Sequence, residues 1–167
     1  MSIVPVPPGR LGPVLRAHRA AVSRAMKTGM KLGAQRGRTH LVQKTPVDTG
    51  QMKNAWEVQR AGGGYDVDNT APHAGIVERG ARPHSVSDAG ILALERWAMR
   101  QLGVKDEQEA HAVAMGIAWK IRNRGQEPTW VVRDSLDDLR RYLGEETDRA
   151  IRKVADKPPV DGSGGAK

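Results

Sequence analysis

The hydrophobic pattern changes its period along the chain, and the first period is helical. From about Leu11 to Val42, mostly apolar residues recur every three to four positions, as they do along one face of an α-helix. A second stripe, made of small residues spaced four apart, runs beside the first. The pattern therefore predicts one long N-terminal helix. The first stripe comprises Leu11, Leu15, His18, Val22 and Met26, and the second comprises Ala17, Ala21, Ala25, Gly29, Gly33 and Gly37.

The glycines of the second stripe allow two interpretations. Each glycine inside a helix costs about 1 kcal/mol relative to alanine, so the helix could fray or bend between Gly29 and Gly37. Alternatively, the small residues form a smooth face on which a sheet or a neighbouring subunit packs closely. The residues alone leave both interpretations open.

Beyond the helix the pattern switches to a period of two, which predicts β-strands. Pro46 ends the helix, because the residue before a proline is pushed out of the α region. Inward and outward positions then alternate over residues 52–59 and 65–69, with glycines at 62–64 as a hairpin loop. A third short strand is expected from Ala74 to Glu78. These segments predict a small antiparallel sheet of about three to four strands.

The C-terminal half returns to helical periodicity and predicts three helices. Ser87 and Asp106 are expected N-caps, and Glu109 completes a capping box with Asp106. Gly144 is a point at which the last helix could break. The predicted fold class is therefore α+β, with a long N-terminal helix, a small antiparallel sheet and a helical C-terminal half. The helices are expected over residues 87–102, 106–125 and 132–154.

The domain organisation follows from the composition of the two ends. Residues 1–10 are rich in proline and are expected to form an extended arm. Residues 11–155 are expected to form a single domain, and residues 156–167, with two prolines and four Gly or Ser residues in a row, a disordered tail. The start of the chain lacks the basic and apolar segments of a secretory signal, and no apolar run approaches the length of a membrane span. The sequence thus predicts a product made in the cytoplasm.

The net charge of +8 is concentrated at one end of the chain. Residues 1–47 hold nine Lys or Arg residues and no Asp or Glu, whereas positive and negative charges nearly cancel in the rest. Such a one-sided basic segment suggests an acidic partner, which could be nucleic acid or an acidic protein surface. A merely solvated basic face is the simplest alternative.

The patterns that carry most enzyme chemistry are absent from the sequence. There is no cysteine, so thiol nucleophiles and thiolate metal sites are excluded, and no glycine-rich phosphate loop or nucleophile elbow occurs. The acidic pairs at 137–138 and 145–146 lie on a helix rich in basic residues, which favours a salt-bridged face over paired catalytic carboxylates. We therefore expect no catalytic residues, no bound metal, no cofactor and no enzymatic activity. A metal-dependent hydrolase using His73, Glu78 and His84 is a distant alternative.

Four short motifs, in this order, resemble the head–tail joining proteins of long-tailed bacteriophages, also called neck or tail-completion proteins. The first motif is Thr-Pro-Val-Asp-Thr-Gly at 45–50 followed by Asn-Ala-Trp at 54–56. The second is Asn-Thr-Ala-Pro-His-Ala at 69–74 with Val-Glu-Arg-Gly at 77–80, and the third is the loop at 81–86. The fourth is Arg-Gly-Gln-Glu-Pro-Thr-Trp at 124–130. The resemblance extends over about residues 25–150.

The chain also departs from the family pattern. His73 stands where the family commonly has Tyr, Trp130 stands where Phe is common, and residues 88–124 form a substantial helical insertion. These departures leave the subgroup open, and with it the place of the protein at the head, in the neck or on the tail tube.

The resemblance implies a non-enzymatic structural protein of the virion that forms an oligomeric ring at the head–tail interface. Its implied partners are further copies of itself, the adjacent portal-side and tail-tube proteins, and packaged DNA in the channel. A small basic, sequence-independent DNA-binding protein is the alternative function. The candidate interface residues are Arg16, Arg19, Arg24, Lys27, Trp56, Tyr65, Arg82 and His84. The residues expected to define turns are Pro46, Asp48, Gly50, Pro72, Gly80 and Pro128.

Overall fold

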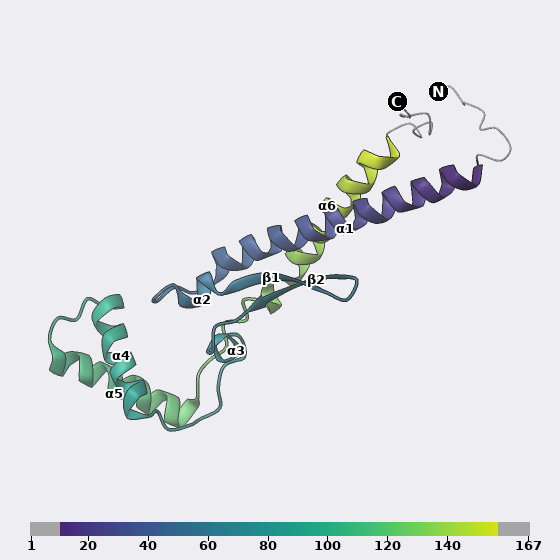
Figure 1. The fold of residues 1–167 in the computed structure, drawn as a ribbon. Coiled ribbons are helices and arrows are strands. Elements are labelled where there is room, and N and C mark those ends of the chain that lie inside the picture. The colour runs from purple at the N-terminus through teal and green to yellow at the C-terminus, as the bar shows by residue number, and fades with distance from the viewer. Residues whose placement is uncertain (1–10, 157–167) are drawn as a thin grey trace. The chain divides into compact units, whose positions relative to one another are not determined.

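The computed structural model describes residues 11–156 (Figure 1). Contacts within this range divide it into two compact units. The helix-pair unit comprises residues 11–39, 58–67 and 136–156. The motif unit, named for the four motifs it contains, comprises residues 40–57 and 68–135. The arm predicted at 1–10 and all but the first residue of the tail predicted at 156–167 lie outside the described residues, and the single domain predicted over 11–155 stays a prediction.

The helix-pair unit is built from most of α1 (Leu11–Lys44), from α6 (Leu136–Ala155), and from most of a hairpin formed by β1 (Trp56–Ala61) and β2 (Gly64–Asn69). α1 is continuous through Gly29, Gly33 and Gly37, as the long predicted helix requires. Its small-residue stripe packs against α6: a Cβ added at Gly29 would lie 2.5 Å from Thr147 Cα, and one at Gly33 would lie 2.8 Å from Leu143 Cα. The stripe is thus a packing face, although the element that covers it is a helix of the same chain.

The apolar stripe that predicted α1 does not form its buried face. Leu15 is 59% exposed and Met26 is 42% exposed, whereas Ala25 and the glycines at 29, 33 and 37 are buried. Helices approach each other most closely where side chains are small, because larger ones would hold the two backbones apart. The small residues therefore decide which face of α1 meets α6.

The motif unit holds α2 (Gln51–Asn54), α3 (Ala74–Arg79), α4 (Asp88–Gln101), α5 (Glu107–Arg124) and the 3₁₀ turn η1 (Arg133–Ser135). α4 and α5 pack together, and alanines fill their interface: Ala98, Ala110 and Ala114 have no exposed surface. Both predicted caps are present. Ser87 Oγ accepts a hydrogen bond from Gly90 N at 3.3 Å, and Asp106 Oδ2 accepts one from Glu109 N at 2.8 Å.

The predicted number of strands is wrong, while the α+β class is confirmed. Within residues 11–156 the sheet has two antiparallel strands rather than three to four. The segment expected as a third strand is α3, because its backbone groups find partners within the segment: Val77 N donates to His73 O at 3.0 Å and Gly80 N to Ile76 O at 2.7 Å. A six-residue segment with no neighbouring strand satisfies its backbone more easily as a helical turn.

Two element boundaries also differ from the prediction. Positions 52–54 belong to α2 instead of the first strand, because Gly50 takes a left-handed conformation with φ 81° and starts a helical turn. The last helix was expected from Val132, but its first residues form η1 and the α-helix begins at Leu136. α6 then continues through Gly144, where the predicted break does not occur.

Candidate assembly surfaces

The first motif is centred on the buried hydroxyl of Thr45. Its Oγ1 donates a hydrogen bond to Leu41 O at 2.6 Å and accepts one from Trp56 Nε1 at 2.7 Å. Trp56 is only 3% exposed. The motif therefore joins the end of α1 to the start of β1, and Trp56, a candidate interface residue, instead lies in the core of the motif unit.

Asp48 does more than shape the predicted turn. Arg100 on α4 binds the Asp48 carboxylate with two hydrogen bonds from Nη2, at 2.8 and 3.0 Å, and one from Nε at 3.1 Å. Arg100 holds the pKa of Asp48 below its ordinary value, chiefly through these hydrogen bonds, with a further one from Gln101. Asp48 thus ties the first motif to the helical insertion, which turn chemistry alone did not indicate.

The second motif is hydrogen-bonded to the first. Asn69 Nδ2 donates to Met52 O at 2.8 Å, and Asn69 Oδ1 accepts from Ala71 N at 3.0 Å. Thr70 N donates to Ala55 O at 3.0 Å. One amide side chain therefore fixes the turn after β2 and holds it against α2.

The third and fourth motifs meet through a short antiparallel bridge between Ala81 and Gln126, whose two N–H···O bonds measure 3.0 and 2.8 Å. Gly80 and Gly125 flank this bridge with φ values of 73° and 77°. A Cβ at Gly80 would collide with Gln126 O, and one at Gly125 would collide with Ala81 O. Glycine is required at both positions, so the turn role predicted for Gly80 has a second cause in close backbone approach.

Glu78 serves the backbone rather than a metal. Its carboxylate accepts hydrogen bonds from Val132 N at 3.0 Å and Arg133 N at 3.1 Å, at the start of η1. Among the described residues, no three His, Cys, Asp or Glu side chains come together in a way that could hold a metal ion. The hydrolase hypothesis with His73, Glu78 and His84 therefore finds no site in the part of the chain that the structure describes.

The other candidate interface residues differ in how far they reach solvent. The four cations at positions 16, 19, 24 and 27 are exposed on α1, and the loop side chains Arg82 and His84 are exposed too. Tyr65 is half-buried and lines an apolar hollow of the helix-pair unit with Met30 and Leu143. Of the predicted turn residues, Pro46 and Pro72 are exposed and Pro128 is half-buried.

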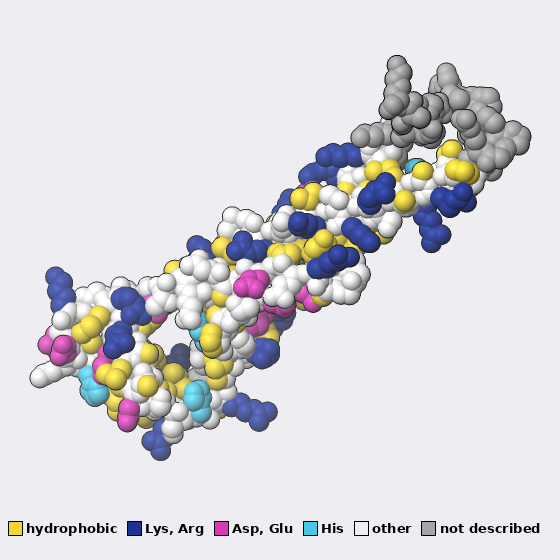
Figure 2. Space-filling model, in the orientation of Figure 1, with side chains coloured by type: hydrophobic (Ala, Val, Ile, Leu, Met, Phe, Trp, Pro, Cys, Tyr) yellow, Lys and Arg dark blue, Asp and Glu magenta, His cyan; other side chains and the backbone are white. Residues whose placement is uncertain are grey.

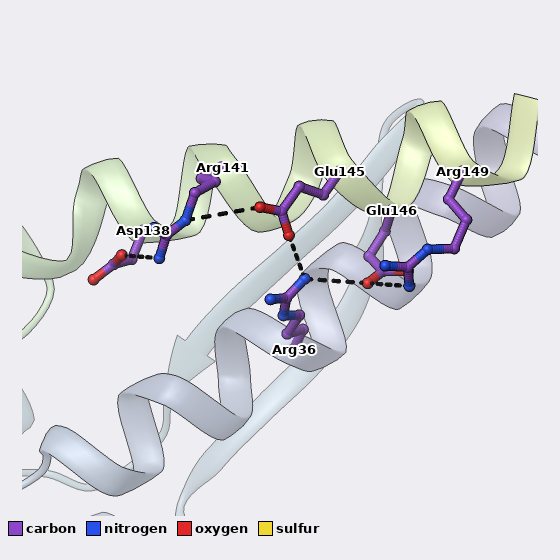
Figure 3. A network of polar contacts seen from close by, with 6 residues as sticks. All are labelled: Arg36, Asp138, Arg141, Glu145, Glu146 and Arg149. Atoms are coloured by element: carbon purple, nitrogen blue, oxygen red, sulfur yellow. Dashed lines mark hydrogen bonds and ion pairs between the residues drawn. The ribbon is translucent and has the colours of Figure 1, made fainter.

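The acidic pairs of α6 are salt-bridged, as predicted: Asp138, Glu145 and Glu146 belong to one ion network (Figure 3), and Asp137 pairs separately with Arg140 at 3.1 Å. Arg36 of α1 donates to Glu145 at 2.6 Å and to Glu146 at 3.3 Å, and Arg149 donates to Glu146 at 2.9 Å. Arg141 extends the network to Asp138. The hydrogen bond to Glu145, followed by the charges of both glutamates, raises the pKa of Arg36. The network crosses from α1 to α6 beside the glycine stripe and gives these carboxylates a structural role.

Sequence reasoning missed an exposed apolar pair on the outer face of α5. Trp119 is 64% exposed and Met115, one turn earlier, is 49% exposed. The signal was present: alanines at 110, 114 and 118 mark the buried face of the helix, so 115 and 119 must point away from it. No described helix is long and apolar enough to span a bilayer.

Residues 13–80 match the HK97-gp10-like family model, described as "Bacteriophage HK97-gp10, putative tail-component". This match to a phage tail-component family, over less than half of the chain, agrees with the resemblance found in the sequence. The match covers α1, the hairpin and α3, and thus the first two motifs, while the third and fourth motifs lie beyond it. Neither the curated proteins nor the solved structures contain a match to the chain. The family match supports a structural role as a phage tail component located in the virion, and it points away from enzymatic activity.

Proposed function

We propose that this protein forms an oligomeric ring at the head–tail interface of a tailed phage and makes the tail competent to join the filled capsid. The match of residues 13–80 to a phage tail-component family carries the proposal. The hydrogen-bonded framework of the motif unit supports it, because all four motifs of the resemblance contribute to that one framework. The partners of the ring would be the portal-side and tail-tube proteins.

A closed ring needs a heterologous interface, in which one surface of each subunit meets a different surface of the next. The exposed pair Met115 and Trp119 is suited to one side of such a contact, since exposed aromatic side chains are common anchors of protein interfaces. The outer edge of β2 is suited to the other side, because no third strand follows it in the described residues. The loop with Arg82 and His84 would reach an adjacent ring.

The mass of the purified protein in solution tests the ring directly. Light scattering gives the mass and negative-stain imaging shows the assemblies, each with and without portal-side and tail-tube proteins. We expect a closed ring, or a monomer that becomes one on meeting those proteins. The substitution Trp119→Glu should reduce assembly, whereas Gln108→Glu, an equal charge change at another exposed position of α5, should not. A chain that stays monomeric with every partner would refute the ring.

The basic face of α1 keeps sequence-independent DNA binding as a second candidate function. Arg16, Arg19, Arg24 and Lys27 are exposed, and none of them forms an ion pair with a described residue. Reversing the charge of all four should abolish binding to random duplex. It should also flatten the salt dependence, in which the logarithm of the binding constant falls by about 0.9 per contacted phosphate for each tenfold rise in salt concentration. Reversing Arg96, Lys105, Arg122 and Arg124 in the motif unit is the matched control. Unchanged head–tail joining by the α1 variant would remove any electrostatic role of this face.

A further inference from the structure

The helix-pair unit contains an open groove of about 530 Å³ between the N-terminal half of α1 and the C-terminal half of α6. Small and apolar side chains form its floor, and hydrophobic side chains lie among Lys and Arg over this part of α1 (Figure 2). The small-residue face of α1 packs against α6 further along, but this stretch is left uncovered by any described residue. The floor residues are Val14, Ala17, Ala21 and Ala25 of α1 and Ala150 and Val154 of α6.

The charge on the walls of the groove is positive. Arg24, Arg149 and Lys153 line it together with one carboxylate, that of Glu146. Glu146 is buried and already accepts hydrogen bonds from Arg149 and Arg36, so its charge is compensated. Arg24 and Lys153 form no ion pair with a described residue. Two cations therefore flank the apolar floor without a counter-charge in the part of the chain that the structure describes.

The shape of the floor suits an α-helix. Ala17, Ala21 and Ala25 follow each other at intervals of four residues, which leaves a smooth track along α1. The lining runs from Val14 to Leu32, about 27 Å at the rise of an α-helix. A helix of about 18 residues would cover this length and would pack on α1 and α6 as the third member of a bundle.

The apolar floor favours an acidic protein helix over DNA as the partner of this groove. DNA would engage Arg24 and Lys153 through phosphates, but it would leave the floor exposed to water. A protein helix with an apolar stripe and acidic flanks would satisfy both features at once. We propose that this groove binds one amphipathic α-helix of a partner protein, with apolar residues on the floor and Asp or Glu facing Arg24 and Lys153. The proposal rests on the groove and holds whether or not the protein forms a ring.

The test uses the full chain and a designed, fluorescently labelled peptide of 18 residues that carries Leu or Ala on one helical face and Glu on both flanks. Binding is measured by fluorescence anisotropy, and peptide helicity by circular dichroism. We expect micromolar binding, with the peptide becoming helical when bound. Two control peptides should bind at least about tenfold more weakly. One has the same composition in scrambled order, and the other has Lys in place of Glu.

Variants of the protein separate the floor from its charges. Ala17→Trp fills the floor without changing charge, and Ala17 is exposed, so the helix should still fold. Ala20→Trp is its matched control, because Ala20 is exposed on α1 but does not line the groove. Ala21→Trp repeats the test one turn further along α1.

The charge variants test the flanks of the groove. Arg24→Glu with Lys153→Glu reverses the flanking charges, and Lys105→Glu with Arg122→Glu is the control with an equal change of charge. We expect at least about tenfold weaker peptide binding in the groove variants and less than twofold change in the controls.

A contrary outcome would either overturn the proposal or assign the groove to a different occupant. Equal binding of the scrambled peptide, or unchanged affinity in Ala17→Trp and Ala21→Trp, would overturn the proposal. So would a protein that ignores the peptide but binds a random 20-base-pair duplex through Arg24 and Lys153, because the face would then belong to DNA. Conversion of an oligomer to a monomer by Ala17→Trp would assign the groove to a second copy of the chain. Peptide binding by a chain that never forms a ring would sustain this inference while refuting the proposed function.

Discussion

The two units of this protein depend on opposite properties of their side chains. In the helix-pair unit, α1 and α6 are in contact because side chains are absent: backbone atoms of Thr147 and Leu143 occupy the space that a Cβ at Gly29 or Gly33 would need. In the motif unit, the chain is held by particular polar atoms that are present, such as Thr45 Oγ1 and the amide of Asn69. The first unit should therefore be sensitive to added volume, and the second to deleted atoms.

The largest effect should come from removing the central side chain of the motif unit. Trp56→Ala deletes a buried indole and its hydrogen bond to Thr45, and we expect a loss of about 3–5 kcal/mol in the free energy of unfolding. Trp119→Ala is the matched control: Trp119 is mostly exposed, so its loss should change stability by less than about 0.5 kcal/mol. Urea denaturation followed by circular dichroism measures both. Equal effects of the two substitutions would contradict the central role of Trp56.

A single methyl group should test the helix-pair unit. Gly29→Ala places a Cβ against the backbone of Thr147, and we expect a net loss of about 1–3 kcal/mol, although alanine is the better helix former. Gly144→Ala adds the same group to α6 where nothing lies within 4 Å, and it should raise stability by up to about 1 kcal/mol. Thermal unfolding of the two variants gives the sign of each change. A stabilising Gly29→Ala would mean that α1 and α6 do not approach closely in solution.

Thr45→Val tests the hydrogen bond alone, because it keeps the volume of the side chain and removes one oxygen. The hydrogen bond that Trp56 Nε1 makes at 2.7 Å loses its acceptor in a buried place, so we expect a cost of about 1–3 kcal/mol. Thr45→Ser keeps the hydroxyl and loses only a methyl group, and it should restore most of the hydrogen-bond contribution. If Val were tolerated better than Ser at this position, packing rather than hydrogen bonding would hold the motif.

The smallest effect should come from the exposed ion pair of Asp48. Because Arg100 lowers the pKa of Asp48 in the folded protein, the pair stabilises above the carboxyl's unfolded pKa of about 3.9. That contribution should disappear as the pH falls through the lower folded pKa. Both side chains are more than one third exposed, so we expect less than about 1 kcal/mol. Urea denaturation of wild type and Asp48→Asn should differ at pH 7 and converge at pH 2. A difference that persisted at pH 2 would exclude the ion pair as its cause.

The sequence predicted local elements well where a cap or a glycine marks them. Ser87, Asp106 and Gly125 were expected to bound two helices, and the structure confirms each boundary because a cap depends on atoms only three or four residues away. The hairpin around residues 62–64 was predicted for the same reason. The third strand was wrong, because a strand exists only if another segment pairs with it, and a single-sequence pattern does not contain that partner.

The candidate surfaces show the same difference: features that depend on nearby residues were predicted, and features that depend on remote segments were not. Exposed cations on α1 could be inferred from sequence alone, since charged side chains are rarely buried without a partner. Trp56 could not be placed in this way: the resemblance made it a candidate interface residue, and only its hydrogen bond to the buried hydroxyl of Thr45 shows that its indole points inward. The groove escaped prediction because it is formed by residues more than a hundred positions apart.

The sequence alone predicted the long basic helix, the caps of α4 and α5, the glycine turns and the resemblance to phage tail components, since each depends on residues close together in the chain. Only the tertiary structure decided which stripe of α1 is buried, what Asp48 and Glu78 hold, and where an open groove remains. Those features depend on distances between segments remote in sequence, where a helix meets whichever neighbour can approach its smallest side chains.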